Sequence, residues 1–102
     1  MTQTDIPDKI IIWAVKAISG EITKNMRMVA FSYVDETAKF RFYVADKPSE
    51  DDKESGEIIA LNFDSGLPKN LKSLDVEFVT TKAPLGTLDP LGFILFRRNE
   101  GL

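Results

Sequence analysis

The chain of 102 residues contains no cysteine and no histidine. The absence of cysteine excludes a disulfide scaffold and every thiolate metal site. The absence of histidine removes the side chain that most often serves as a general acid or base near neutral pH. A binding protein is therefore favoured over an enzyme, and we expect no catalytic residue, no metal site and no cofactor.

Glycine-rich loops and long hydrophobic runs are also missing. The six glycines are scattered, so no phosphate loop is present, and no Gly-x-Ser-x-Gly turn marks a nucleophile. The apolar run at residues 10–18 is interrupted by Lys16 and is too short to span a bilayer. The first residues lack the basic region of a signal peptide. These absences predict a cytoplasmic protein with no membrane partner.

What the chain does have is the composition of an ordinary globular protein. Hydrophobic residues make up 43% and charged residues 28% of the sequence, so disorder is not favoured. Its length suits one hydrophobic core, and no repeat or linker interrupts it. We therefore expect a single αβ domain over residues 1–102.

Negative charge is concentrated in one block. Residues 46–57 hold six acidic side chains against two lysines, a local charge of −4 within a net charge of −3. Nucleic acid is a poor partner for such a chain, because phosphate contacts need clustered lysine and arginine. A basic protein partner fits better. The candidate partner-binding residues are Glu50, Asp51, Asp52, Glu54 and Glu57.

Two other interpretations of the charged residues stay open. The acidic block is also what a solvated helix start looks like, because acids in a first turn favour the helix dipole. Four arginines could form a basic patch on the strands, although solvated strand charges are favoured for them. These arginines are Arg27, Arg41, Arg97 and Arg98.

Residues 6–19 are predicted to form the first helix. Asp5 is the expected N-cap, Pro7 suits the first turn, and Gly20 suits the C-terminal stop. Apolar residues recur at helical spacing and should face the core. This inward stripe comprises Ile6, Ile10, Trp13, Ala14, Ala17 and Ile18.

A second helix is predicted to open at Ser49, with Asp52 completing a capping-box-like start, and to end at residues 64–68. Gly56 weakens a helix by roughly 1 kcal/mol relative to alanine, so this is the least stable element expected. The predicted inward stripe consists of Gly56, Ile59, Ala60 and Phe63.

Residues 26–34 and 39–45 are predicted to form a hairpin across residues 35–38. Pairing by alternation places the aromatic residues on one buried face and leaves a mixed face at least partly in water. The predicted pairs are Tyr33 with Phe40, Phe31 with Phe42, and Val29 with Val44.

Two further strands complete the expected fold. Leu74–Thr81 alternates, whereas Leu91–Arg98 is apolar on both sides, so it should be central in its sheet or covered on its outer face. The order α-β-β-α-β-β predicts an α+β fold. We expect one largely antiparallel four-stranded sheet with both helices packed on one face.

Three segments together carry a resemblance. Residues 11–29 combine a hydrophobic helix with a Gly-x-Ile turn and an Asn-x-Arg sequence, residues 48–52 read Pro-Ser-Glu-Asp-Asp, and residues 90–100 hold Leu-Gly and Arg-Arg pairs. Their order resembles a family of small bacterial αβ proteins that includes immunity proteins of contact-dependent growth inhibition systems. The resemblance implies tight binding and neutralisation of a toxin domain, often a nuclease.

Two functional hypotheses follow from the sequence. The first is a non-catalytic immunity protein whose acidic residues bind a cognate, basic toxin domain. The alternative is a general protein-interaction or scaffold module, homodimeric through the mixed face of the hairpin or the uncovered side of the last strand.

Overall fold

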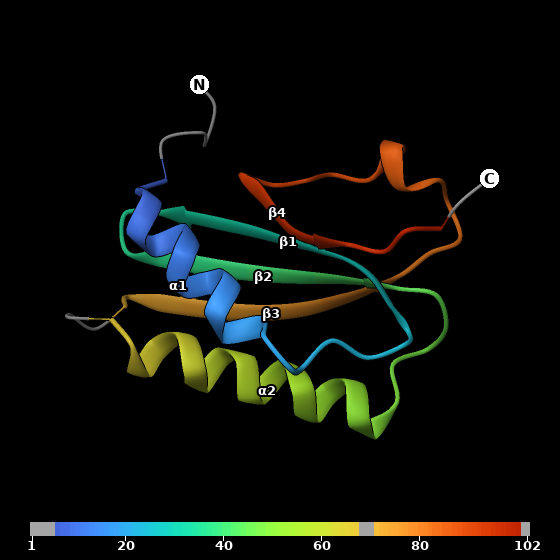
Figure 1. Cartoon of the computed structure of the whole chain (residues 1–102), viewed down its shortest axis with the longest axis horizontal. Coiled ribbons are helices and arrows are strands. Elements are labelled where there is room, and N and C mark those ends of the chain that lie inside the picture. The colour runs from blue at the N-terminus through green and yellow to red at the C-terminus, as the bar shows by residue number, and fades with distance from the viewer. Residues whose placement is uncertain (1–5, 68–70, 101–102) are drawn as a thin grey trace.

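The computed structural model describes residues 6–67 and 71–100, and it confirms the predicted element order (Figure 1). The described residues form two helices, four strands and one 3₁₀ turn. Their bounds are α1 Asp8–Ile18, β1 Met26–Val34, β2 Thr37–Val44, α2 Glu50–Ser65, β3 Ser73–Thr80, η1 Leu85–Thr87 and β4 Phe93–Arg97.

The start of α1 differs slightly from the prediction. Pro7 is the N-cap, and its carbonyl accepts hydrogen bonds from the amides of Ile10 and Ile11. The predicted N-cap, Asp5, lies outside the described residues. Gly20 follows the helix with a φ of +82°, a left-handed conformation that glycine adopts without strain, so it ends the helix as predicted.

The sheet is mixed, and the prediction of a largely antiparallel sheet was wrong. Its strand order is β3-β2-β1-β4. β1 pairs antiparallel with β2 and β4, but β2 and β3 are parallel over eight residue pairs. The physical reason is that α2 connects β2 to β3 and returns the chain to the same end of the sheet, which is how parallel neighbours are joined.

The β1–β2 hairpin has the predicted faces but a different register. Phe31 pairs with Phe40 rather than Phe42, because the turn contains only Asp35 and Glu36, with φ values of +51° and +64°. Two consecutive positive φ values match the tight turns that follow the twist of a hairpin. The shift is two residues, and side chains alternate with period two, so the same residues stay buried.

Both helices pack on one face of the sheet, as predicted, and the main core lies between the two layers (Figure 1). Phe31, Phe40 and Phe63 form its centre, with ring centroids 5.0 to 5.4 Å apart. Trp13 packs at the edge of this core, and its Nε1 donates a 3.0 Å hydrogen bond to the Phe63 carbonyl. The helices are thereby joined to each other as well as to the sheet.

The opposite face of the sheet carries a second, smaller core. Met28, Ala30 and Tyr43 are buried there under the loop between β3 and β4. The mixed face of the hairpin is thus more buried at these positions than predicted. The same loop covers the outer face of β4, which is an edge strand and not a central one. The apolar residues that pack on this second core are Val79, Leu85, Leu88, Leu91 and Ile94.

Candidate functional site

The acidic block lies at the start of α2, where a capping box fixes the first turn. Ser49 is the N-cap, and its Oγ accepts a hydrogen bond from the Asp52 amide at 3.1 Å. The Asp52 carboxylate in return accepts from the Ser49 amide at 2.9 Å. The capping box predicted from the sequence is confirmed, and it sets the direction in which the acidic side chains leave the helix.

Asp52 is not a surface residue, because only 1% of it is exposed. Its Oδ1 accepts from the Thr23 hydroxyl at 2.6 Å, and its Oδ2 accepts from the Asn25 side-chain amide at 2.8 Å. Burial alone would raise the pKa of this carboxyl, but hydrogen bonds from Thr23, Ser49 and Asn25 outweigh burial and hold the pKa below its ordinary value. Asp52 therefore joins α2 to the α1–β1 loop.

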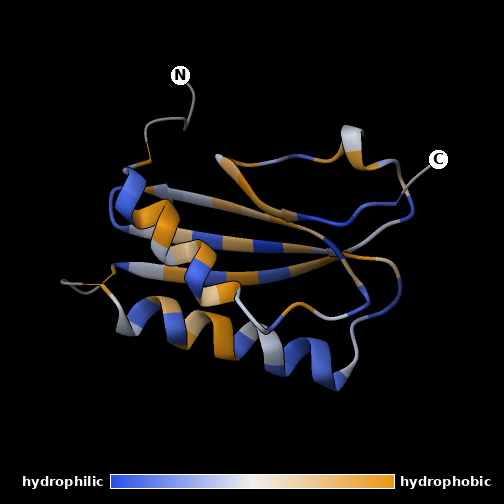
Figure 2. Ribbon diagram, viewed as in Figure 1, coloured by the Kyte–Doolittle hydropathy of each residue, from blue (hydrophilic) through white to orange (hydrophobic). Residues whose placement is uncertain are grey.

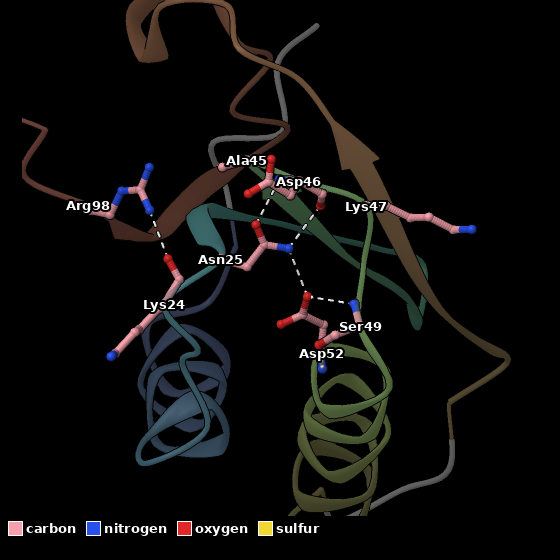
Figure 3. A pocket seen from close by; sticks show the side chains of 8 residues that line it. All are labelled: Lys24, Asn25, Ala45, Asp46, Lys47, Ser49, Asp52 and Arg98. Carbon is pink, nitrogen blue, oxygen red and sulfur yellow. Dashed lines mark hydrogen bonds between the residues drawn. The ribbon is translucent and has the colours of Figure 1, made fainter.

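Asn25 extends this network to the segment between β2 and α2 (Figure 3). Its side chain donates to the Asp46 carbonyl at 2.9 Å and accepts from the Asp46 amide at 2.7 Å. A shallow pocket of about 390 Å³ opens beside these contacts. Its lining residues are Lys24, Asn25, Ala45, Asp46, Lys47, Ser49, Asp52 and Arg98.

The other four predicted acids are all exposed on α2. Glu50, Glu54 and Glu57 are spaced four and three residues apart, which places them on one face of the helix. Leu61 continues this face one turn further and is 69% exposed. Among the residues that the structure describes, none lies within ion-pairing distance of these three glutamates or of Asp51. Asp51 points about 100° away from Glu50 and is exposed beside this face, and we call the four exposed acids together the acidic face.

An unpaired row of this kind opposes helix stability. Like charges at this spacing destabilise a helix by about 0.2–0.5 kcal/mol per pair. The only basic residue within the bounds of α2 is Lys53. The acids of the first turn gain some energy from the helix dipole, but Glu54 and Glu57 lie beyond that turn. A structural role thus explains Glu50 and Asp51 better than it explains Glu54 and Glu57.

The arginines do not form an open basic patch. Arg27 is 4% exposed and makes two 2.8 Å bonds to the two oxygens of Glu100, while its Nη1 donates to the Thr81 carbonyl. Solvation, the favoured prediction, is therefore wrong for Arg27. Arg41 pairs with Glu77 and Asp89, and Arg98 pairs with Glu100. Only Arg97 is exposed without a described acidic partner.

The sequence pattern contained one signal for these buried contacts, namely the Asn-x-Arg motif of residues 25–27. Asn25 bonds Asp52 and Asp46, whereas Arg27 bonds Glu100. The motif thus connects the start of β1 to α2 on one side and to the end of the chain on the other. Neither Asp52 nor Glu100 could be identified as its partner from the sequence, because both are distant along the chain.

Two further findings concern the described residues. Within residues 6–67 and 71–100, no group of three or more acidic side chains is arranged to hold a metal ion. No helix in this described part is both long enough and apolar enough to cross a membrane.

The mixed four-stranded sheet, the two helices on one face and the acidic outer face of α2 define a small two-layer α+β domain. The model of the MafI2 immunity protein family matches residues 7–100, so the chain belongs to this family. No curated protein matches the chain. The family match confirms the expected relation to immunity proteins, but it does not specify contact-dependent growth inhibition.

Proposed function

We propose that this protein binds a toxin domain and neutralises it by covering the surface with which the toxin binds its substrate, without catalysis of its own. The observation that carries the proposal is membership of an immunity protein family over residues 7–100. The absence of histidine and cysteine supports a binding mechanism, because the commonest acid–base and nucleophilic groups are missing. We place this binding in the cytoplasm, because proteins there are rarely stabilised by disulfides and this chain has no cysteine.

The acidic face of α2 is the proposed binding surface. Its four carboxylates are exposed and have no ion pairs with described residues, so a partner does not have to break existing contacts to reach them. Asp52, which the sequence placed in the same set, supports this surface from inside by holding the first turn. Leu61 adds an exposed apolar contact on the same helix face.

The partner proposed for this surface is a basic, nuclease-type toxin domain. A nuclease must attract phosphate, so its substrate-binding surface carries lysine and arginine. A row of unpaired carboxylates complements such a surface and accelerates association through long-range attraction.

Co-expression in bacterial cells tests the function directly. Where a gene next to that of this chain encodes a large secreted protein, the C-terminal domain of that protein is the toxin to test. We expect the chain to restore growth of cells that express this domain, and the purified pair to form a stable complex. Unchanged killing in the presence of folded protein would exclude the immunity function towards this toxin.

Paired variants test the binding surface separately. Glu54→Lys should slow association with the toxin domain about tenfold or more, whereas Asp75→Lys should change it little, because Asp75 is exposed on the sheet face opposite the helices. Both variants make the same change of charge. Equal effects from the two would show that net charge matters and that the acidic face has no special role.

A further inference from the structure

The outer surface of α2 changes in character along the helix. Its first turns carry the acidic face, and Figure 2 shows that a hydrophobic segment follows them, which corresponds to residues 58–61. Residues four apart lie one above the other on a helix, so they form rows along its surface. Two such rows begin with an acid, continue with an apolar residue and end with a polar one. They are Glu57, Leu61, Ser65 and Glu54, Ile58, Asn62.

A groove of about 270 Å³ lies between α2 and α1 where these rows end. Trp13 has a fixed position in it, because its Nε1 donates to the Phe63 carbonyl and its ring occupies the space that a Cβ on Gly66 would need. On the α2 side, the Asn62 side chain donates to the Ala17 carbonyl at 3.3 Å. The walls of the groove are therefore preformed. Its lining residues are Trp13, Lys16, Ala17, Asn62 and Ser65.

The two sides of the groove differ in charge. Lys16 is exposed on the α1 side, and its Nζ lies 5.8 Å from the centre of the Trp13 ring. On the α2 side, the rows that reach the groove start at the acidic face. A basic partner is therefore attracted along α2 and repelled at Lys16, so its cations belong over the first turns of α2. The part of such a partner that reaches the groove has to be uncharged.

Charge alone does not explain a tight complex. Exposed carboxylates mainly accelerate the encounter, whereas the lifetime of a complex depends on a few side chains that are buried in well-packed pockets at its centre. Leu61 is 69% exposed, so it contributes little to the core of this chain. It lies in the same row as Glu57 and as Ser65 in the groove. Leu61 and the half-buried Trp13 are thus apolar groups next to the acidic face.

We propose that the groove between α1 and α2 receives an apolar side chain of the toxin domain, whose basic residues lie over the acidic face. This inference rests on the proposed function and adds the contact that holds the complex together. The occupant is argued from charge complementarity and from the continuity of the groove with the acidic rows of α2. The acidic face then determines how fast the partners meet, and the groove determines how long they stay bound.

Dissociation rates of the complex separate the groove from the acidic face. With the toxin domain of the co-expression test, Leu61→Ala should raise the dissociation rate about tenfold and leave the association rate nearly unchanged. Ser65→Trp, which fills the groove, should raise the dissociation rate at least as much. Circular dichroism verifies that each variant folds, and if Ser65→Trp does not fold, Leu61→Ala decides the test.

Two matched variants serve as controls and should leave the dissociation rate unchanged. Val34→Ala also shortens an exposed apolar side chain, but strand alternation places Val34 with Met28 and Ala30 on the sheet face opposite the helices. Asp64→Trp adds the same bulk as Ser65→Trp, but this side chain leaves the helix about 100° away from that of Ser65.

The single tryptophan of the chain gives a direct signal from the groove. When this chain alone is labelled with 5-fluorotryptophan, Trp13 gives one fluorine resonance, and the unlabelled toxin domain adds none. We expect this resonance to move when the wild type binds the toxin domain. The same movement is expected for Glu54→Lys at saturating toxin, because this variant slows the encounter and leaves the groove intact.

Either of two results would overturn the inference and leave the proposed function standing. One is a wild-type complex in which the Trp13 resonance does not move. The other is a dissociation rate of Leu61→Ala that equals the rate of its control. A wild type that neither binds the toxin domain nor protects cells from it would remove the proposed function, and the inference with it.

Discussion

Asp52 is the residue for which sequence and structure assign different roles to the same side chain. Its position in an acidic run suggests a surface charge, yet its carboxylate is buried and accepts hydrogen bonds from Thr23, Asn25 and Ser49. Asp51, one residue earlier, is exposed and has no such partner among the described residues. The difference comes from helix geometry, because consecutive residues point about 100° apart.

Asp52→Asn should therefore destabilise the fold, whereas Asp51→Asn should not. Asparagine removes the negative charge that strengthens these bonds. Its amide nitrogen also takes the place either of Oδ2, which accepts from Asn25 and Ser49, or of Oδ1, which accepts from Thr23, and we expect a loss of about 1–3 kcal/mol. Urea denaturation at neutral pH measures the difference between the two variants. Equal midpoints would show that the network around Asp52 contributes nothing to stability.

Glu100 is a second carboxylate whose role depends on contacts distant in the sequence. Hydrogen bonds from Arg27 are the main cause that lowers its pKa from 4.5 to about 2, against a smaller opposing effect of burial, and Arg98 lowers it further. A carboxyl whose pKa is lower in the folded state than in the unfolded state stabilises the fold. This stabilisation is fully present when the pH is above the unfolded-state pKa, and it is lost as the pH falls through the folded-state pKa.

Acid titration checks the prediction for Glu100. We expect its side-chain carboxyl carbon, followed by nuclear magnetic resonance, to titrate near pH 2 in the wild type and at a clearly higher pH in Arg27→Met, where only Arg98 still lowers the pKa. Glu100→Gln should be less stable than the wild type at pH 7, and this difference should disappear as the pH falls through about 2. A wild-type midpoint near 4.5 would mean that the ion pair does not persist in solution.

At the scale of elements, Gly56 explains why α2 tolerates a residue that weakens helices. A Cβ at this position would lie 3.1 Å from Cζ of Phe78 and 3.2 Å from Cγ1 of Val76. The glycine therefore lets α2 approach β3 closely. The sequence indicated only the helix penalty, because the strand that contacts Gly56 follows it by about twenty residues.

Gly56→Ala should destabilise the protein by about 1 kcal/mol, since overpacking outweighs the gain of roughly 1 kcal/mol in helix propensity. The same substitution in a Phe78→Leu background should be neutral or stabilising, because the ring that it meets is gone. Thermal denaturation of the four proteins of this cycle measures the coupling. A stabilising Gly56→Ala in the wild-type background would contradict the close packing.

Element boundaries and faces were more predictable than strand pairing. Both helices, the four strands and the buried face of the hairpin follow from periodicity and capping residues. The hairpin register was missed by two residues, because the alternation pattern cannot distinguish a two-residue turn from a four-residue turn. The parallel pairing of β2 and β3 was missed because strand direction depends on how α2 crosses the sheet.

At the scale of the whole molecule, the acidic face lies near one edge of the sheet. It is on α2, which packs near β3, whereas α1 packs near β4 at the other edge. Leu61, the most exposed large hydrophobic residue among those that the structure describes, lies on the same helix face. The net charge alone, −3 over 102 residues, gives no indication of this arrangement.

The acidic face predicts a salt-dependent association with a basic toxin domain. The Debye length, beyond which charges are screened from each other, falls from about 10 Å at 0.1 M salt to about 3 Å at 1 M. The association rate should therefore fall steeply over this range, while the dissociation rate changes less. Stopped-flow measurements of binding at several salt concentrations provide the test. Association that is independent of salt would show that charge does not guide the encounter.

The sequence by itself determined the element order, the buried face of the hairpin, the capping box and the concentration of acids at one helix start. These features are local, because they depend on spacings of two to four residues. Only the tertiary structure decided which acids are exposed, which strand closes the sheet, and that Asn25 and Arg27 bind Asp52 and Glu100. Those outcomes depend on segments that meet across 27 to 73 residues of chain, which no local pattern specifies.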